Sequence, residues 1–285
     1  MVCWDNRAGG SGPTFLLIHG LFDSKACWRS LCSQLHPRYR VVVPDLVGFG
    51  DSSKPLLQEQ PEEWRYSVSM FAHHLQSLIR ELDLHRLVLV GNSLGGAIAL
   101  EVLSAAGRCR ARIGGLVLIA AAGYPQPLPG NIRQLAGPVG PLLRRKPIRH
   151  LLGRAGITQY FIERTFARTF HKTSRIPPES VAESLRILQA PNALYTCHAA
   201  ARALLHRDWE KTAAQIQQVR VPTLIIWGER DRILPLANGY RFARDIPQSQ
   251  LRRIGSCGHS PQLEAPRLVG KLVANWVENA GVRLS

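Results

Sequence analysis

The stretch Leu87-Val-Leu-Val-Gly91-Asn92-Ser93-Leu94-Gly95-Gly96 decides the fold of this 285-residue chain. Its apolar opening predicts a strand buried on both faces, and the residues from Leu94 onward favour a helix. A serine on so sharp a strand-to-helix turn has a strained backbone, so the residues two positions before and after it must lack bulk. Because Gly91 and Gly95 satisfy this condition, Ser93 is predicted to be a nucleophile at the end of a strand. The competing interpretation is a glycine-rich turn with an incidental serine.

Short apolar runs of the same kind recur along the chain and alternate with longer helical patterns. This alternation predicts an α/β fold with a doubly wound, mostly parallel sheet, although a parallel barrel would show it too. The predicted strands are Phe15–His19, Arg40–Pro44, Leu87–Gly91, Leu116–Ala120, Pro222–Trp227 and Leu251–Ile254. The helices predicted between and after these strands are Ser69–Asp83, Leu94–Ala106 and Arg267–Ala280.

The long stretch between Ala120 and Pro222 lacks a convincing strand. It opens with a segment rich in Pro, Gly and Leu, residues 124–147, and continues with helical patterns. We therefore predict a helical cap at residues 124–206, inserted between two parts of the core at residues 1–123 and 207–285. The predicted cap helices are Arg149–Arg154, Gln159–Phe170, Pro178–Gln189 and Ala193–Leu205.

Composition narrows the class of protein. Hydrophobic residues make up 45% of the chain, enough for a sizeable core, and no apolar run approaches the roughly 20 residues of a membrane span. The sequence does not open with an export signal, which predicts a cytoplasmic protein. Its six cysteines are scattered and form no Cys-x-x-Cys, so we expect reduced thiols and no metal site.

Basic residues are concentrated in the predicted cap, where twelve Lys or Arg stand against three Glu and no Asp. Such a cluster could steer anionic substrates or associate weakly with an anionic surface without inserting into a membrane, but a solvated helical face is the preferred interpretation. Nucleic-acid binding is not expected, because no known binding signature is present. Aromatic residues at helical spacing in the cap predict packing in its core or an acyl pocket: Tyr160, Phe161, Phe166 and Phe170. The basic cluster comprises Arg144, Arg145, Lys146, Arg149, Arg154, Arg164, Arg168 and Lys172.

A serine hydroxyl needs a positioned base to become nucleophilic, and a histidine base needs an acid to fix its tautomer. His259 lies in a glycine-rich loop after the last predicted strand, and it is the predicted base. Asp231 follows the buried run Pro222–Trp227, at the strand end where catalytic groups of open α/β sheets gather. Asp231 is the preferred acid, with Glu229 as its competitor.

The tetrahedral intermediate of acyl transfer also needs two N–H donors for its oxyanion. The backbone N–H of Leu94, directly after the predicted nucleophile, is one candidate. The second is expected in the loop His19-Gly20-Leu21-Phe22, with Leu21 preferred over Phe22. At this place His19 is more often structural than a base.

Together these stretches resemble the α/β-hydrolases of the serine esterase and lipase type, in the order Ser93, Asp231, His259. The resemblance runs from about residue 13 to 280 and implies an eight-stranded, mostly parallel sheet with a helical cap and no cofactor. The family usually opens with two extra strands; Val2-Cys-Trp resembles the second of them, and we expect the first to be absent or clipped. The matching stretches are His19-Gly20, Pro44-Asp45-Leu-Val-Gly48-Phe-Gly50-Asp51-Ser52, Gly91-Asn-Ser93-Leu-Gly95-Gly96, Trp227-Gly-Glu-Arg-Asp231 and Gly258-His259.

Three functions remain open at this point. The first is hydrolysis of small, uncharged carboxylic esters of short to medium acyl chain through an acyl-enzyme. The second uses the same residues for C–C bond hydrolysis of a meta-cleavage-type diketone, for thioester cleavage or for acyl transfer. The third is a ligand receptor on a hydrolase scaffold. The resemblance favours ester cleavage, because related epoxide hydrolases carry an aspartate in place of Ser93. The C–C hydrolases often show Gly-Pro-Gly where this chain has Leu21-Phe-Asp.

Overall fold

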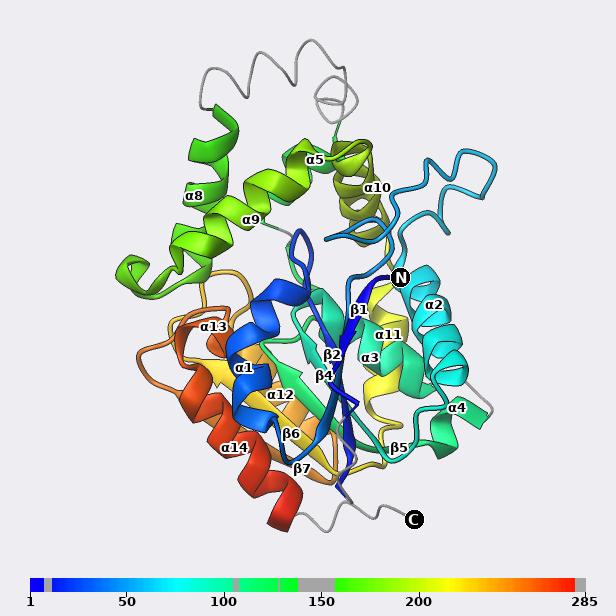
Figure 1. The fold of residues 1–285 in the computed structure, drawn as a ribbon, viewed down its shortest axis with the longest axis vertical. Coiled ribbons are helices and arrows are strands. Elements are labelled where there is room, and N and C mark those ends of the chain that lie inside the picture. The colour runs from blue at the N-terminus through cyan, green and yellow to red at the C-terminus, as the bar shows by residue number, and fades with distance from the viewer. Residues whose placement is uncertain (8–11, 105–107, 128, 138–156, 280–285) are drawn as a thin grey trace.

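The fold was determined as a computed structural model that describes residues 1–7, 12–104, 108–127, 129–137 and 157–279. The strands of these residues form one sheet in the order β1-β3-β2-β4-β5-β6-β7, parallel except for β1, which pairs antiparallel with β3. This is the doubly wound, mostly parallel sheet expected from the alternation (Figure 1). The strands are β1 (Cys3–Asp5), β2 (Thr14–Ile18), β3 (Arg40–Pro44), β4 (Leu87–Asn92), β5 (Ile113–Ile119), β6 (Thr223–Gly228) and β7 (Ser249–Ile254).

The described residues contain seven strands, where the resemblance implied eight. β1 corresponds to the expected second strand of the family, since it is the antiparallel edge strand and includes the Cys-Trp pair of Val2-Cys-Trp. The difference therefore affects one edge of the sheet and leaves the strands that carry the predicted site in place.

The central strands are buried on both faces, which explains their continuous apolar runs. Every residue of β2, β4 and β6 is buried. Successive side chains point to opposite faces, so Leu16 and Ile18 join one core cluster while Phe15 and Leu17 join the other. The edge strand β7 instead alternates between exposed and partly buried residues along most of its length.

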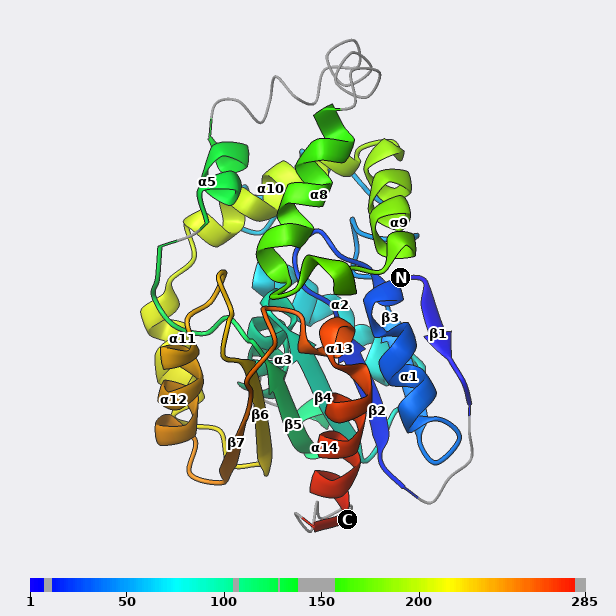
Figure 2. The same cartoon turned by 90° about the vertical axis from the view of Figure 1, so that its left-hand side faces the viewer.

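Helices cover both faces of the sheet (Figures 1 and 2). On one face, α1 (Arg29–Leu35) packs with α14 (Pro266–Asn279), and their apolar side chains contribute to the cluster that holds Phe15 and Leu17. The opposite face is covered by four helices, namely α2 (Val68–Glu81), α3 (Leu94–Ser104), α11 (Trp209–Ile216) and α12 (Leu236–Asp245). Shorter elements are η1 (Lys25–Trp28), α4 (Arg108–Ala111) and α13 (Pro261–Glu264).

Between β5 and β6 the described residues form helices above one end of the sheet (Figure 2). Two of them match their predicted bounds, and the predicted Gln159–Phe170 overlaps α8. The predicted helix Arg149–Arg154 lies outside the described residues, as do residue 128 and residues 138–147 of the segment rich in Pro, Gly and Leu. The division into a core and a cap at residues 124 and 206 is kept as a proposal. The elements above the sheet are α5 (Gly130–Ala136), α8 (Ile157–Thr169), η2 (Thr173–Arg175), α9 (Pro178–Gln189) and α10 (Ala193–Leu205).

The chain changes direction across the sheet between β2 and β4. From β2 it passes to β3 on one side, then crosses back to β4 on the other. In open α/β sheets the loops that leave the strands at such a point diverge, and ligands bind in the space they leave. The loops after β2 and β4 carry the predicted oxyanion residues and Ser93.

Candidate active site

Ser93 occupies the single position between β4 and α3, with a backbone φ of +54°. This conformation is strained for a residue other than glycine. Three backbone hydrogen bonds hold it in place. The Ser93 N–H donates to the carbonyl of Ile119 at 3.1 Å, and the Ser93 carbonyl accepts from Gly96 at 3.0 Å and Ala122 at 2.9 Å. These hydrogen bonds thus hold Ser93 in a backbone conformation that a serine rarely adopts by itself.

The two glycines of the turn are needed because backbone atoms lie where their side chains would be. A Cβ on Gly91 would come within 2.3 Å of the Gly95 carbonyl oxygen, and one on Gly95 within 2.1 Å of the Ile18 oxygen. Glycine therefore allows α3 to begin directly against β2 and β4. This agrees with the expectation that the residues two positions before and after Ser93 must lack bulk.

His259 and Asp231 form a hydrogen-bonded pair at the same end of the sheet. Nδ1 of His259 lies 2.8 Å from Oδ2 of Asp231, with the two side chains 6% and 0% exposed. Because an ionised carboxylate only accepts, Nδ1 carries the hydrogen and Nε2 is left as an acceptor. The other carboxylate oxygen of Asp231 accepts the N–H groups of Ile233 at 2.8 Å and Leu234 at 2.9 Å.

The competitor acid lies elsewhere. Glu229 is exposed, and its carboxylate is 3.3 Å from the guanidinium of Arg253 on β7. The structure therefore pairs His259 with Asp231, the preferred acid of the two.

The histidine loop is tied directly to the serine turn through Asn92. The side-chain amide of Asn92, the residue before Ser93, donates to the carbonyl oxygen of His259 at 3.3 Å and to that of Ile119 at 3.1 Å. The last residue of β4 thus brings together segments that are 167 residues apart in the sequence.

The loop after β2 passes next to Ser93. A Cβ on Gly20 would lie 3.3 Å from Cβ of Ser93, so the backbone of this loop comes close to the serine at Gly20. Leu21 and Phe22 are both partly buried, and Leu94 is the first residue of α3. The predicted oxyanion donors, the N–H groups of Leu94 and Leu21, belong to the residues that directly follow Ser93 and Gly20, the two residues of this close approach.

His19 is structural in this arrangement. It is fully buried, its Nδ1–H donates to the Gly20 carbonyl at 2.8 Å, and its Nε2 accepts the Leu46 N–H at 3.1 Å. Burial lowers the pKa of His19 and so favours the neutral ring that these two hydrogen bonds require. Both ring nitrogens are occupied, which agrees with the structural role expected for this histidine.

A match to a known family covers the part of the chain that carries Ser93, Asp231 and His259. A family model described as the alpha/beta hydrolase fold matches residues 13–266. The chain belongs to the α/β-hydrolases.

Similar proteins of this family are named for different hydrolytic activities. The chain is 30% identical to a 2-hydroxy-6-oxo-2,4-heptadienoate hydrolase of Pseudomonas putida, covering 94% of this chain and 90% of that protein. It is 29% identical to a 2-hydroxymuconate semialdehyde hydrolase of a Pseudomonas strain, with coverages of 95% and 89%. Among solved structures, a thermophilic esterase from Thermogutta terrifontis superposes with a TM-score of 0.77 at 26% identity, covering 98% of this chain and 93% of that one.

One buried charge cluster of this α/β-hydrolase was not predicted. Asp45, whose side chain is fully buried, accepts the backbone N–H of Lys25 at 2.7 Å and its ammonium group at 2.6 Å. The same ammonium group contacts Asp51 at 2.5 Å, and Asp51 also binds Arg186 of α9 at 2.7 Å. The cluster links the loops after β2 and β3 to a helix above the sheet. Lys25 gives no sequence signal for this role, because its partners lie 20 and 26 residues away.

Apolar side chains from above the sheet pack against the core cluster that includes Leu94, the residue after Ser93. Leu188 of α9 and Tyr195 of α10 pack against the same core cluster as Leu21 and Phe22 of the loop after β2. The core on this face of the sheet thus receives apolar side chains both from the loop after β2 and from the helices above the sheet.

The expected packing of the cap aromatics is correct for only some of them. Phe170 is buried and contacts Phe166 with ring centroids 6.1 Å apart. Tyr160 and Phe161 are instead 60% and 46% exposed, so the prediction that they pack in a core is wrong. They border a groove of about 290 Å³ together with Arg164 and Arg168.

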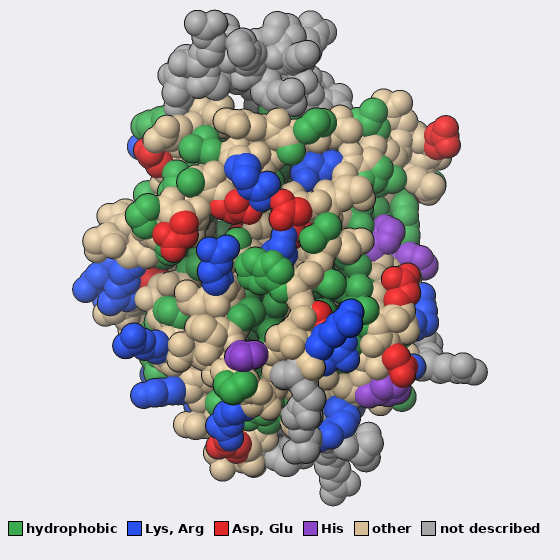
Figure 3. Space-filling view, in the orientation of Figure 1, with side chains coloured by type: hydrophobic (Ala, Val, Ile, Leu, Met, Phe, Trp, Pro, Cys, Tyr) green, Lys and Arg blue, Asp and Glu red, His purple; other side chains and the backbone are tan. Residues whose placement is uncertain are grey.

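The exposed basic residues are spread over the surface. Arg164, Arg168 and Lys172 are all exposed, whereas the remaining members of the predicted cluster, between residues 144 and 154, lie outside the described residues. On the face in Figure 3, Lys and Arg side chains are interspersed with Asp and Glu.

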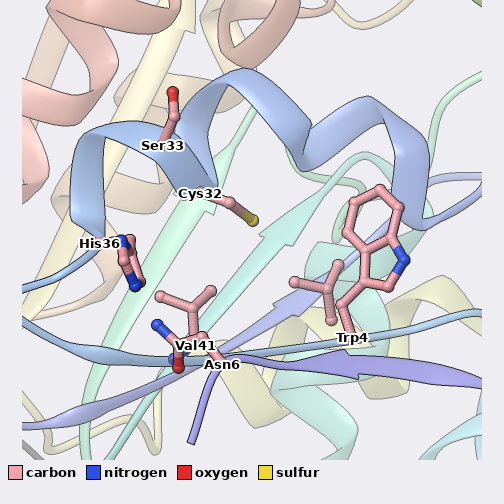
Figure 4. A pocket seen from close by; sticks show the side chains of 7 residues that line it. Trp4, Asn6, Cys32, Ser33, His36 and Val41 are labelled. Carbon is pink, nitrogen blue, oxygen red and sulfur yellow. The ribbon is translucent and has the colours of Figure 1, made fainter. Parts of the chain in front are cut away.

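In the described part of the chain, no three His, Cys, Asp or Glu side chains are arranged to hold a metal ion, and no helix is long and apolar enough to cross a membrane. All six cysteines are free. A pocket of about 240 Å³ between α1 and the strands β1 and β3 contains Cys32 and His36 (Figure 4). Burial raises the pKa of Cys32 to about 12, so this thiol is a poor nucleophile at neutral pH.

Proposed function

We propose that the protein is a serine hydrolase that cleaves carboxylic esters through an acyl-enzyme intermediate. The observation that carries this proposal is the hydrogen bond from His259 to Asp231 in a loop that Asn92 ties to the serine turn. A histidine whose Nδ1 is held by a carboxylate, so that Nε2 can accept the proton of a serine on a strained turn, is the arrangement that makes a hydroxyl nucleophilic.

The chemistry assigns one step to each group. Nε2 of His259 takes the proton of Ser93 as the serine oxygen attacks the ester carbonyl carbon. The N–H groups of Leu94 and Leu21 stabilise the resulting oxyanion. The protonated ring, held by Asp231, then passes the proton to the departing alkoxide, and water releases the acid by the same sequence. These steps need neither a cofactor nor a metal ion.

The substrate that fits best is an uncharged ester with a short to medium acyl chain. The apolar side chains of Leu21, Phe22, Leu188 and Tyr195 support this choice, since they pack against the core cluster that includes Leu94 and offer contact area to an alkyl group but no partner for a charge. Residues 124–206 would act as the cap over this substrate.

C–C bond hydrolysis is the second candidate function. Two relatives along nearly the whole chain are named for hydrolysis of a dienoate and of a muconate semialdehyde. The same serine, histidine and aspartate could serve this reaction, so the distinction depends on the substrate pocket.

A direct comparison of substrates tests the proposal. We would measure kcat/KM for p-nitrophenyl acetate, butyrate and dodecanoate, and for 2-hydroxy-6-oxohepta-2,4-dienoate, with the wild type and Ser93→Ala. The proposal predicts the highest value for butyrate and a loss of several orders of magnitude in Ser93→Ala. A strong preference for the dienoate would establish the second candidate instead, and equal, slow rates in both proteins would exclude both.

A further inference from the structure

Glu264 is a buried carboxylate that the proposed reaction does not use. Its side chain is fully buried in α13, five residues after His259. Oε2 accepts the N–H groups of Gly258 at 2.8 Å and His171 at 3.0 Å, and Oε1 accepts the N–H of Lys172 at 3.0 Å. Its nearest cation is Arg175, 3.9 Å away.

These three donors come from two different parts of the fold. Gly258 directly precedes His259, whereas His171 and Lys172 follow the end of α8 above the sheet. Figure 2 shows this end of α8 next to α13. A single carboxylate therefore joins the histidine loop to the segment that follows α8.

The main chain of the histidine makes a second connection to the same segment. The N–H of His259 donates to the carbonyl of Thr169 at 2.6 Å. A Cβ on Gly258 would come within 2.3 Å of the same Thr169 oxygen, so glycine allows this close approach. The backbone of His259 is thus bound on one side to the end of α8 and on the other to Asn92 of the serine turn.

A buried carboxylate persists only where hydrogen bonds replace its lost water, and here main-chain donors supply them. Removing one hydrogen-bonded group would leave donors unpaired and free the loop to shift. The thiol of Cys257 lies in the same loop, and burial together with the nearby Glu264 carboxylate raises its pKa to about 12.

We propose that Glu264 is a positioning residue that holds the His259 loop against the end of α8, so that the base reaches Ser93 only when this contact is intact. This inference rests on the proposed function. It assigns to residues 169–172 a role in placing the base, in addition to covering the sheet.

The test is the rate at which a fluorophosphonate labels Ser93. In this reaction the serine oxygen bonds to phosphorus, fluoride leaves, and His259 takes the serine proton. The labelling rate therefore measures how well His259 acts as a base, and it can be measured without knowing the natural substrate. We would compare the wild type with Glu264→Gln, in which an NH₂ group replaces one acceptor oxygen and faces an N–H donor. Rates per folded protein are measured from pH 5 to 9, together with kcat and KM for p-nitrophenyl butyrate.

Two variants serve as matched controls. Glu278→Gln makes the same chemical change at an exposed carboxylate of α14 that pairs with Arg38. Leu75→Ala removes a fully buried side chain of α2 and lowers stability without a hydrogen bond to the histidine loop.

The inference predicts that Glu264→Gln lowers the labelling rate and kcat by about tenfold or more, with KM nearly unchanged, while both controls keep the wild-type rate. An unchanged rate in Glu264→Gln, or an equal fall in Leu75→Ala, would overturn it. If Glu264→Gln does not fold, Arg175→Ala replaces it, because this exposed residue donates to the Ser256 carbonyl of the same loop at 3.0 Å. A smaller fall is then expected, and no fall would overturn the inference. A wild type that is not labelled at Ser93 would instead refute the proposed function itself.

Discussion

Asp231 divides its two carboxylate oxygens between the histidine and the main chain. Oδ2 accepts Nδ1–H of His259 at 2.8 Å, while Oδ1 accepts two backbone N–H groups, those of Ile233 and Leu234. The orientation of the carboxylate is thus set by its own loop and does not depend on the histidine. The histidine in turn has one tautomer available to it.

This division predicts a large effect of Asp231→Asn. The amide oxygen of the new side chain will face the two backbone donors, which leaves its NH₂ group toward His259. Nδ1 must then accept, the hydrogen moves to Nε2, and the ring can no longer take the serine proton. We expect kcat for p-nitrophenyl butyrate to fall by about 10³- to 10⁴-fold with little change in melting temperature.

Glu229→Gln is the matched control for that variant. The same chemical change is made two residues away, at an exposed side chain paired with Arg253. Activity should remain within about twofold of the wild type, as expected for a surface ion pair. A loss in Glu229→Gln comparable to that in Asp231→Asn would show that the acid has been misassigned.

The strained serine predicts a stability difference between two inactive variants. Both Ser93→Ala and Ser93→Gly remove the hydroxyl, but only glycine adopts a φ of +54° without a Cβ clash. Relief of strain exceeds the added entropy of the unfolded chain, so Ser93→Gly should unfold with a free energy about 0.5–1 kcal/mol higher than Ser93→Ala. Urea denaturation of the two variants measures this difference. Greater stability of Ser93→Ala would contradict the strained turn.

The glycine after the serine should not tolerate a side chain. In Gly95→Ala the new Cβ would lie 2.1 Å from the Ile18 oxygen, a backbone atom of β2 that cannot move freely. We expect a loss of about 2 kcal/mol or more in the free energy of unfolding, and a loss of activity as the turn shifts. Gly130→Ala is its control, since a Cβ there meets nothing within 4 Å. Equal stability of Gly95→Ala and the wild type would contradict the packing of α3 against β2.

The charge cluster next to α9 predicts a pH-dependent contribution to stability. Hydrogen bonds from Lys25 and then Arg186 lower the pKa of Asp51 to about 2. Because the folded-state pKa lies below the unfolded value of about 4, the stabilisation is present above pH 4 and is lost as the pH falls toward 2. The free energy of unfolding should therefore differ between the wild type and Asp51→Asn at pH 7 by up to about 1 kcal/mol, reduced by the partial exposure of Asp51, and converge near pH 2. A difference that stays constant over this range would contradict the pairing.

The sequence predicted the centre of the fold better than its periphery. The strands around Ser93 are continuous apolar runs, and α9 and α10 have a clear helical period, so local pattern sufficed. The helices α1, α11 and α12 were missed because each is short and spans at most three turns. β5 begins at Ile113, three residues before the predicted start at Leu116. The prediction began late because Gly114 and Gly115 interrupt the apolar pattern of the strand. Gly115 is there to make room for Trp276, whose ring would lie 3.0 Å from a Cβ at that position.

The candidate site likewise contains residues that the sequence predicts and residues that it does not. Ser93, Asp231 and His259 follow strands and glycine-rich turns whose spacing is visible in the sequence. Lys25 and Glu264 are charged residues whose burial depends on partners far along the chain, and in the sequence both resemble surface residues. Long-range hydrogen bonds such as that of Glu264 to His171 appear only when the fold brings the segments together.

The most direct test of the account is to detect the acyl-enzyme. Wild type and Ser93→Ala would be mixed with p-nitrophenyl butyrate, quenched in acid before the steady state, and studied by intact-protein and peptide mass spectrometry. We predict one butyryl group on the peptide that carries Ser93 in the wild type, formed with a burst of p-nitrophenolate, and neither in Ser93→Ala. A butyryl group on another residue, or full turnover by Ser93→Ala, would contradict the account.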